Sequence, residues 1–214
     1  MPAVLGAPSN PFSTRFHAPG AIPFRFQKER GAASAGECFE RFAAHGYCSE
    51  IHGPHGTGKT TLLHELEREA RARGFEVLRV TLHADQRRMP NGWSEPNGAS
   101  GTRRTILFLD GAEQLARARR WLVRRRCRDL GWGLLATTHG TLGLPVLYCS
   151  GVDAEFAERL VAGLLAQCPG QPRLVRPDEA RAALAEAQGN LREAIFRLYD
   201  LYEERWRQRT VQVE

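Results

Sequence analysis

The stretch Gly53-Pro54-His55-Gly56-Thr57-Gly58-Lys59-Thr60 decides how this chain folds. It matches in full the pattern G-x-x-x-x-G-K-[ST], a loop whose backbone N–H groups surround phosphate oxygens. Its glycines leave those N–H groups unobstructed, and the helix that follows presents its positive end to the anion. We expect Lys59 to contact the β- and γ-phosphates of ATP, and Thr60 to offer its hydroxyl to Mg²⁺. The predicted nucleotide-binding residues are Gly53, Pro54, His55, Gly56, Thr57, Gly58, Lys59, Thr60 and Thr61.

The segments on either side supply the context that such a loop requires. Tyr47–Ile51 is a predicted strand that leads into it. Thr60–Arg73 is a predicted helix, which Gly74 ends. The apolar residues of this helix recur at helical spacing, at Leu62, Leu63, Leu66 and Ala70. A strand followed by the loop and a helix argues against a glycine-rich turn that arose by chance.

The rest of the chain alternates between strands and helices and then changes to helices alone. Further strands are predicted at Phe75–Leu82, Thr105–Leu109, Gly133–Thr138 and Pro145–Cys149. Further helices are predicted at Ser34–His45, Glu113–Arg128, Asp153–Ala166, Asp178–Gln188 and Leu191–Gln208. This order predicts the α/β class, with a P-loop NTPase parallel sheet flanked by helices and a small C-terminal all-helical lid.

Three parts are expected along the chain. Residues 1–33 are rich in proline, glycine and phenylalanine and are predicted to form an extended arm that packs its aromatic side chains on a neighbouring surface. Residues 34–151 form the predicted α/β ATPase core, and residues 152–214 the helical lid. Within the core, Ala84–Arg104 has no apolar pattern, and a loop of that length is commonly functional or disordered.

The composition bears on the partners, the location and the state of the cysteines. The net charge is +6, which favours an anionic partner such as nucleotide, nucleic acid or an acidic protein face without requiring one. No stretch approaches the roughly 18 apolar residues of a membrane helix, and the N-terminus lacks the pattern of a secretory signal, so we expect a cytoplasmic protein. The cysteines are scattered and are interpreted as reduced thiols: Cys38, Cys48, Cys127, Cys149 and Cys168.

A P-loop protein needs a second magnesium contact, an acid at the end of a buried strand. Asp110 follows the apolar run Ile106–Leu109 and is the predicted residue. Many ATPases carry a glutamate next to this aspartate as the base for the attacking water, but Gly111 stands there. Glu113 is therefore a candidate catalytic base, with Gln114 as a second group that could position water. Asp110 and Glu113 also have the spacing of a helix capping box, and both interpretations stay open.

The strand predicted at Gly133–Thr138 ends in polar groups. In a parallel sheet, such strand ends line the ligand crevice. Thr137, Thr138 or His139 could therefore sense the γ-phosphate, although the hydroxyls could instead only cap the strand.

Arginines crowd the helix predicted at Glu113–Arg128. We expect Leu115, Ala118 and Leu122 to form its buried stripe. A second face would gather Arg117, Arg120, Arg124 and Arg128. This face could bind nucleic-acid phosphates, supply an arginine to a neighbour's nucleotide, or be an ordinary solvated surface.

The arrangement resembles the AAA+ ATPases over about residues 10–206. The features that carry this resemblance are the P-loop, the acidic strand Ile106–Asp110, the polar strand end at Thr137 and Thr138, and the helical tail. Gly189-Asn190-Leu191-Arg192-Glu193-Ala194 is similar to the family's second sensor motif, which implies that Arg192 reaches the γ-phosphate. The segment from Asn10 to Phe24 resembles the arms that cover adenine in this family. Two departures are Gly111 after the aspartate and the short gap His139–Leu144, which leaves no helix for the usual trans arginine and puts an obligate ring in doubt.

The sequence therefore predicts an ATP- and Mg²⁺-binding AAA+ ATPase, a hydrolase that acts as a nucleotide-driven regulator or motor on a DNA or protein partner. The predicted catalytic residues are Asp110, Glu113, Thr138 and Arg192, and the predicted metal ligands are Thr60 and Asp110. Two alternatives remain, a small-molecule kinase and a switch or scaffold that binds ATP without hydrolysing it.

Overall fold

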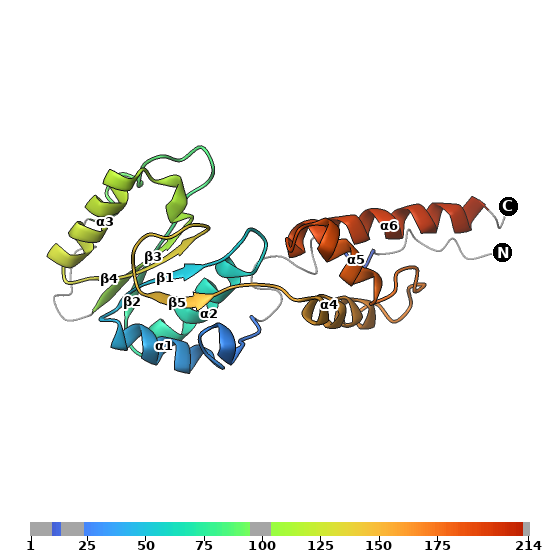
Figure 1. Ribbon diagram of the computed structural model, residues 1–214, viewed down its shortest axis with the longest axis horizontal. Helices are drawn as coiled ribbons and strands as arrows, with labels where there is room; N and C mark the ends of the chain where they lie inside the picture. The colour runs from blue at the N-terminus through green and yellow to red at the C-terminus, as the bar shows by residue number, and fades with distance from the viewer. Residues whose placement is uncertain (1–9, 14–23, 95–103, 212–214) are drawn as a thin grey trace. The chain divides into compact units, whose positions relative to one another are not determined.

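A computed structural model describes residues 10–13, 24–94 and 104–211. These residues form two compact units (Figure 1). An α/β unit is made from residues 24–53 and 58–150, and a helical unit from residues 10–13, 54–57 and 151–211. The division of the chain into arm, core and lid at the predicted boundaries stays a prediction.

The α/β unit contains a five-stranded parallel sheet with the order β2-β3-β4-β1-β5. The strands are β1 (Cys48–His52), β2 (Glu76–Thr81), β3 (Thr105–Asp110), β4 (Gly133–Thr138) and β5 (Val146–Cys149). The helices are α1 (Ala35–Ala44), α2 (Lys59–Ala72) and α3 (Arg117–Asp129), with short 3-10 turns η2 (Lys28–Arg30) and η3 (Ala112–Gln114). The predicted fold class, a parallel α/β sheet with a C-terminal helical segment, is confirmed.

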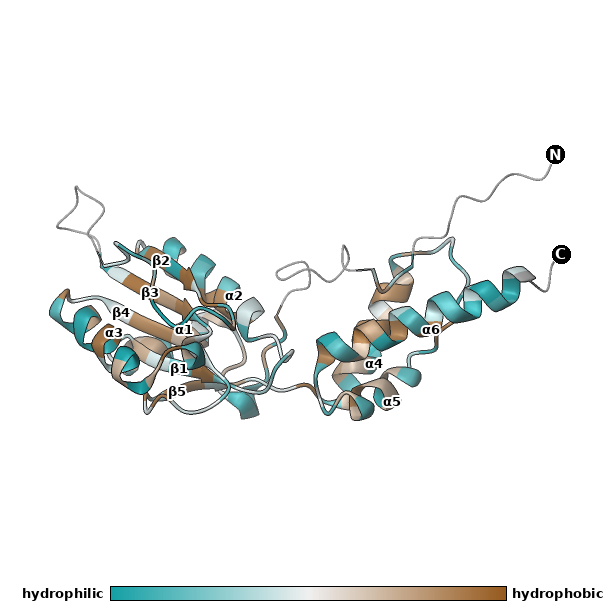
Figure 2. Cartoon of the chain, turned by 90° about the horizontal axis from the view of Figure 1, so that it is seen from above, coloured by the Kyte–Doolittle hydropathy of each residue, from teal (hydrophilic) through white to brown (hydrophobic). Residues whose placement is uncertain are grey.

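The central strands are buried on both faces, which explains their continuous apolar sequence. On β3, Ile106 and Phe108 pack with α1 and α2, whereas Leu107 and Leu109 pack on the opposite face, where α3 contributes Val123. Side chains that alternate along a strand point to opposite faces, so one short apolar run supplies both halves of the core. Figure 2 shows this apolar character along the inner strands.

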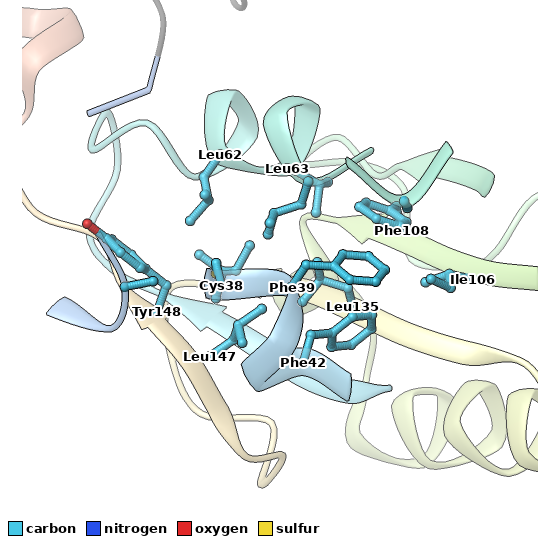
Figure 3. Packing of buried hydrophobic residues seen from close by; sticks show 14 of the residues in the cluster. Cys38, Phe39, Phe42, Leu62, Leu63, Ile106, Phe108, Leu135, Leu147 and Tyr148 are labelled. Carbon is cyan, nitrogen blue, oxygen red and sulfur yellow. The ribbon is translucent and has the colours of Figure 1, made fainter. Parts of the chain in front are cut away.

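Aromatic rings fill the half of the core beneath α1. The rings of Phe39 and Phe42 meet edge to face at 5.9 Å (Figure 3). Phe42 meets Tyr47 in the same way at 5.5 Å. The Ser34 hydroxyl accepts a hydrogen bond from the Glu37 N–H and begins α1, as expected for a serine N-cap.

Residues 24–33 continue this aromatic packing onto the edge strand β5. Phe24 and Phe26 both contact the ring of Tyr148, at 5.4 and 6.2 Å between centroids. The backbone N–H of Gln27 donates to the Tyr148 hydroxyl at 2.8 Å. The part of the predicted arm nearest the core is therefore fixed to β5, while residues 1–9 and 14–23 lie outside the described residues.

The helical unit contains α4 (Ala154–Ala166), α5 (Glu179–Glu186) and α6 (Leu191–Val211). Phe12 is fully buried among these helices, with its ring edge-on to Tyr202 at 6.3 Å. The Asn10 side chain donates to the Tyr199 carbonyl oxygen and to Glu203 Oε1. Among the described residues, no helix is long and apolar enough to cross a membrane.

The prediction for the arginine-rich helix was wrong in its phase. The chain forms the turn η3, breaks at Leu115 and Ala116, and only then begins α3 at Arg117. Leu115 is buried, but Ala118 and Leu122 are exposed, and the buried residues of α3 are Val123 and Cys127. The break resets the helical register, so a stripe counted from Leu115 does not continue into α3.

Replacing Phe12 with alanine should destabilise the helical unit by about 3–5 kcal/mol, because a fully buried ring would leave a cavity. Hydrogen exchange of the α6 amides, followed by mass spectrometry, measures this loss locally. Phe196→Ala is the matched control on α6, since Phe196 is 41% exposed and should cost about 1 kcal/mol or less. Equal acceleration of exchange in both variants would contradict the packing described for Phe12.

Candidate nucleotide site

Lys59 is the first residue of α2 and is held inside the α/β unit. Its ammonium donates to the Gly53 carbonyl oxygen at 2.7 Å and lies 3.1 Å from His139 Nδ1. Burial lowers the pKa of Lys59 to about 8, although the nearby carboxylates of Glu113 and Asp110 favour the charged form. The ammonium is thus a partly desolvated charge that an anion can stabilise.

Asp110, at the end of β3, is positioned by hydroxyl groups from two other elements. Its Oδ2 accepts a hydrogen bond from Thr60 at 2.9 Å, and its Oδ1 accepts one from Thr137 at 2.6 Å. The Thr137 hydroxyl in turn accepts from the Gly111 N–H at 2.9 Å. The structure therefore brings the two predicted metal ligands, Thr60 and Asp110, together.

These two oxygen groups fit a magnesium ion. Mg²⁺ prefers hard oxygen ligands and is commonly held by one or two protein groups, water and substrate phosphates. The Thr60 hydroxyl and one Asp110 oxygen are adjacent at the start of α2, beside Lys59. Arg79 Nη2 lies 3.9 Å from the same Asp110 oxygen and keeps a positive charge near the carboxylate.

Gly111 has a structural reason to follow Asp110. Its φ of +81° lies in the left-handed region, and a Cβ added there would stand 2.5 Å from the Leu82 carbonyl oxygen. A glutamate directly after Asp110 would therefore be strained and would collide with the backbone after β2. The candidate base is displaced into the following turn, η3.

Glu113 faces the site rather than capping a helix. Its Oε1 lies 3.1 Å from His139 Nε2, and its Oε2 is buried with no hydrogen-bond partner among the described residues. Asp110 does not form the capping box that was the alternative interpretation, because its carboxylate accepts from Thr60 and Thr137 and no side chain caps η3. A buried carboxylate oxygen without a partner is one that can accept a proton from water.

His139 joins the lysine to the glutamate. Nε2–H can donate to Glu113 while the Nδ1 lone pair accepts from Lys59, so a single neutral tautomer satisfies both contacts. The His139 Nδ1 atom also lies 3.1 Å from the Gly53 carbonyl oxygen. Of the polar groups that end β4, His139 is the one brought to Lys59 and Glu113.

The two threonines before it have other contacts. Thr137 orients Asp110, whereas the Thr138 hydroxyl accepts from the Gly140 N–H at 3.1 Å in the turn after β4. The role given to Thr138 as a sensor stays a prediction. In the described turn between Thr138 and Val146 no helix forms, as expected from its length.

At two of the P-loop glycines, neighbouring side chains lie close to where a Cβ would be. Gly58 has φ +84°, and a Cβ there would contact the Phe24 ring at 3.4 Å. In the helical unit, a Cβ at Gly56 would lie 1.9 Å from Asn190 Oδ1. Asn190 caps α6 by accepting from the Glu193 N–H, and Arg192 is exposed in the first turn of that helix. The predicted role of Arg192 toward the γ-phosphate stays a prediction.

Two arginines near the site make contacts that the sequence analysis did not predict. Arg79 on β2 donates to His64 Nδ1 at 2.7 Å, and burial followed by the Arg79 charge lowers the pKa of His64. Arg120 on α3 donates to the carbonyl oxygens of Leu115 and Glu113, at 2.6 and 3.1 Å. Neither had a signal in the sequence, since an arginine in a strand or an arginine-rich helix is ordinarily solvated.

Known proteins share a sequence pattern and a fold with this chain. The family model described as "ATPase family associated with various cellular activities (AAA)" matches residues 50–129, which include the whole P-loop, Asp110 and Glu113. No curated protein matches the sequence.

The solved structures show the same fold at low sequence identity. Cdc6p from Pyrobaculum aerophilum has a TM-score of 0.62 and 14% identity, over 91% of this chain and 66% of that one. The Walker-type ATPase of Pyrococcus abyssi has a TM-score of 0.53 and 11% identity, over 90% of this chain and 74% of that one. A DNA replication initiation factor has a TM-score of 0.50 and 16% identity, over 79% of this chain and 62% of that one.

The chain spans slightly less than two thirds of the Cdc6p chain. The family model matches residues 50–129 of the α/β unit, and the strand order and the likeness to Cdc6p show that the two chains share a fold.

Proposed function

We propose that this protein is a magnesium-dependent ATPase of the AAA+ type, whose nucleotide state regulates a DNA or protein partner. The observation that supports this most is the chain of contacts from Lys59 through His139 to Glu113, beside the Thr60–Asp110 pair. The residues that we propose to bind phosphate, to hold Mg²⁺ and to act as the base are neighbours in this chain of contacts. A cytoplasmic location is retained as part of the proposal.

Binding comes first in this mechanism. The N–H groups of the P-loop and the positive end of α2 surround the phosphates, and Lys59 leaves the Gly53 oxygen for the β- and γ-phosphates. Thr60 and Asp110 would hold Mg²⁺, which neutralises charge on the phosphates when bound. Arg192 would contact the γ-phosphate from the helical unit, as its likeness to the second sensor implies.

Hydrolysis then uses Glu113. Its Oε2 accepts a proton from the attacking water as the water oxygen bonds to the γ-phosphorus, and the bond to the β–γ bridging oxygen breaks to leave ADP and phosphate. His139 holds the other carboxylate oxygen in place. Loss of the γ-phosphate would end the proposed contact with Arg192, and the partner would respond to this change of nucleotide state.

Steady-state phosphate release from ATP, with and without duplex DNA, tests the proposal as a whole. Phosphate transfer to nucleosides or small metabolites would instead support a small-molecule kinase. Tight ATP binding without any release would support the non-hydrolysing switch.

Lys59→Ala should abolish or gravely weaken ATP binding, because Lys59 supplies the loop's point charge on the phosphates. Titration calorimetry with ATP and Mg²⁺ measures the affinity, and circular dichroism shows whether the variant is folded. Unchanged affinity in a folded variant would remove the P-loop assignment.

Glu113→Gln should lower turnover by about 10²–10⁴-fold, because glutamine cannot accept the proton from water. Its amide oxygen can still accept from His139, so the melting temperature and ATP affinity should change little. Single-turnover phosphate release and thermal unfolding separate the two effects. Full turnover together with lower stability would show that Glu113 is a structural residue and not the base.

Gly111→Ala should destabilise the α/β unit more than Gly131→Ala. Both glycines have positive φ, +81° and +68°, which costs an alanine about 1–2 kcal/mol. Only at Gly111 would the Cβ meet backbone, 2.5 Å from the Leu82 oxygen, whereas it has open space at Gly131. Thermal unfolding of both variants measures the difference, and equal melting temperatures would contradict the close approach.

A further inference from the structure

The α/β unit contains a cavity of about 560 Å³ that the ATPase mechanism does not use. One wall is the segment 88–94, and the other is α3. All of the residues that line it belong to the same unit. A volume of this size can accept one or two side chains of another molecule.

The floor of the cavity is apolar. Met89 and Trp93 are partly buried and pack against the core cluster that includes Val123. Leu122 lines the cavity from α3 and is 54% exposed, as is its neighbour Trp121. A large apolar side chain at the edge of a cavity is typical of a site that receives an apolar anchor.

The rim of the cavity is positively charged. Arg88, Arg119 and Arg126 line it, and all three are exposed. None of the described residues that line the cavity is acidic, and no ion pair within the described part of the chain involves these three arginines. Charges gathered in this way repel one another and favour a negatively charged partner.

We propose that this cavity is a docking site for an acidic segment of a partner protein, with one apolar side chain as its anchor. The anchor would fill the space beside Met89 and Leu122. The carboxylates on either side of it would pair with Arg88, Arg119 and Arg126, and charge-assisted pairs with arginine suit carboxylates well. This site goes beyond the nucleotide chemistry and does not depend on it.

The surroundings of the tryptophans favour a protein over a nucleic acid. Single strands bind by stacking bases on open aromatic faces. Trp93 packs against the core cluster, and the guanidinium of Arg125 lies over the ring of Trp121 at 5.4 Å. The cavity therefore offers a hollow for a side chain rather than a platform for bases.

A short fluorescein-labelled peptide of aspartates and glutamates around a central leucine tests the site. Fluorescence anisotropy with the full chain should give saturable binding, and replacing the central leucine with serine should weaken it by about tenfold, the effect of roughly 1.4 kcal/mol. Absence of saturable binding would overturn the proposal.

Charge-reversal variants locate the site. The double variant Arg119→Glu, Arg126→Glu should weaken peptide binding by at least about tenfold, because two charge pairs are lost. The control Arg117→Glu, Arg128→Glu changes the same charge on the same helix at residues that do not line the cavity, and should have a much smaller effect. Equal weakening in both would mean general charge attraction and would overturn the docking site.

Two further arms complete the test. An oligothymidine that binds more tightly than the peptide and loses its binding in the Arg119, Arg126 variant would assign the surface to nucleic acid and overturn the proposal. ATP affinity, measured in every variant, shows that the protein is folded. It also separates this proposal from the ATPase function, since either can fail while the other stands.

Discussion

The carboxylate of Asp110 is the point on which the rest of the site depends. It receives hydroxyl hydrogen bonds from Thr60 on α2 and Thr137 on β4, and so joins three neighbouring elements at one edge of the sheet. A buried carboxylate is costly unless its oxygens are satisfied, which makes the register between these elements specific. A shift of any one of them would leave a charged oxygen without a partner.

The backbone after Asp110 then limits where the candidate base can lie. The chain turns through the left-handed Gly111 against the Leu82 oxygen, and this contact leaves no room for a side chain. The carboxylate that contacts His139 comes instead from Glu113 in η3. The departure from the usual Asp-Glu pair is thus a consequence of how closely the chain after β2 packs on the end of β3.

Much of this could be predicted from the sequence, for identifiable reasons. The P-loop, the buried strand before Asp110 and the parallel sheet follow from local patterns with few alternatives. The register of α3 could not be predicted in this way, because the two-residue break at Leu115 and Ala116 has no signature in the composition. The contact of His139 with Lys59 joins residues 80 positions apart, and tertiary packing alone decides which of the polar groups after β4 points inward.

Arg120 connects helix α3, which lines the cavity, to the turn η3, which carries Glu113. Its guanidinium donates to the carbonyl oxygens of Glu113 and Leu115, so the start of α3 is fastened to the turn that carries the candidate base. Arg119, beside it in the sequence, lines the cavity between α3 and residues 88–94. A partner that docks there would press on a helix whose first turn holds the Glu113 backbone. In the proposed mechanism Glu113 is the base, and a displacement of α3 that moved its carboxylate would therefore change turnover.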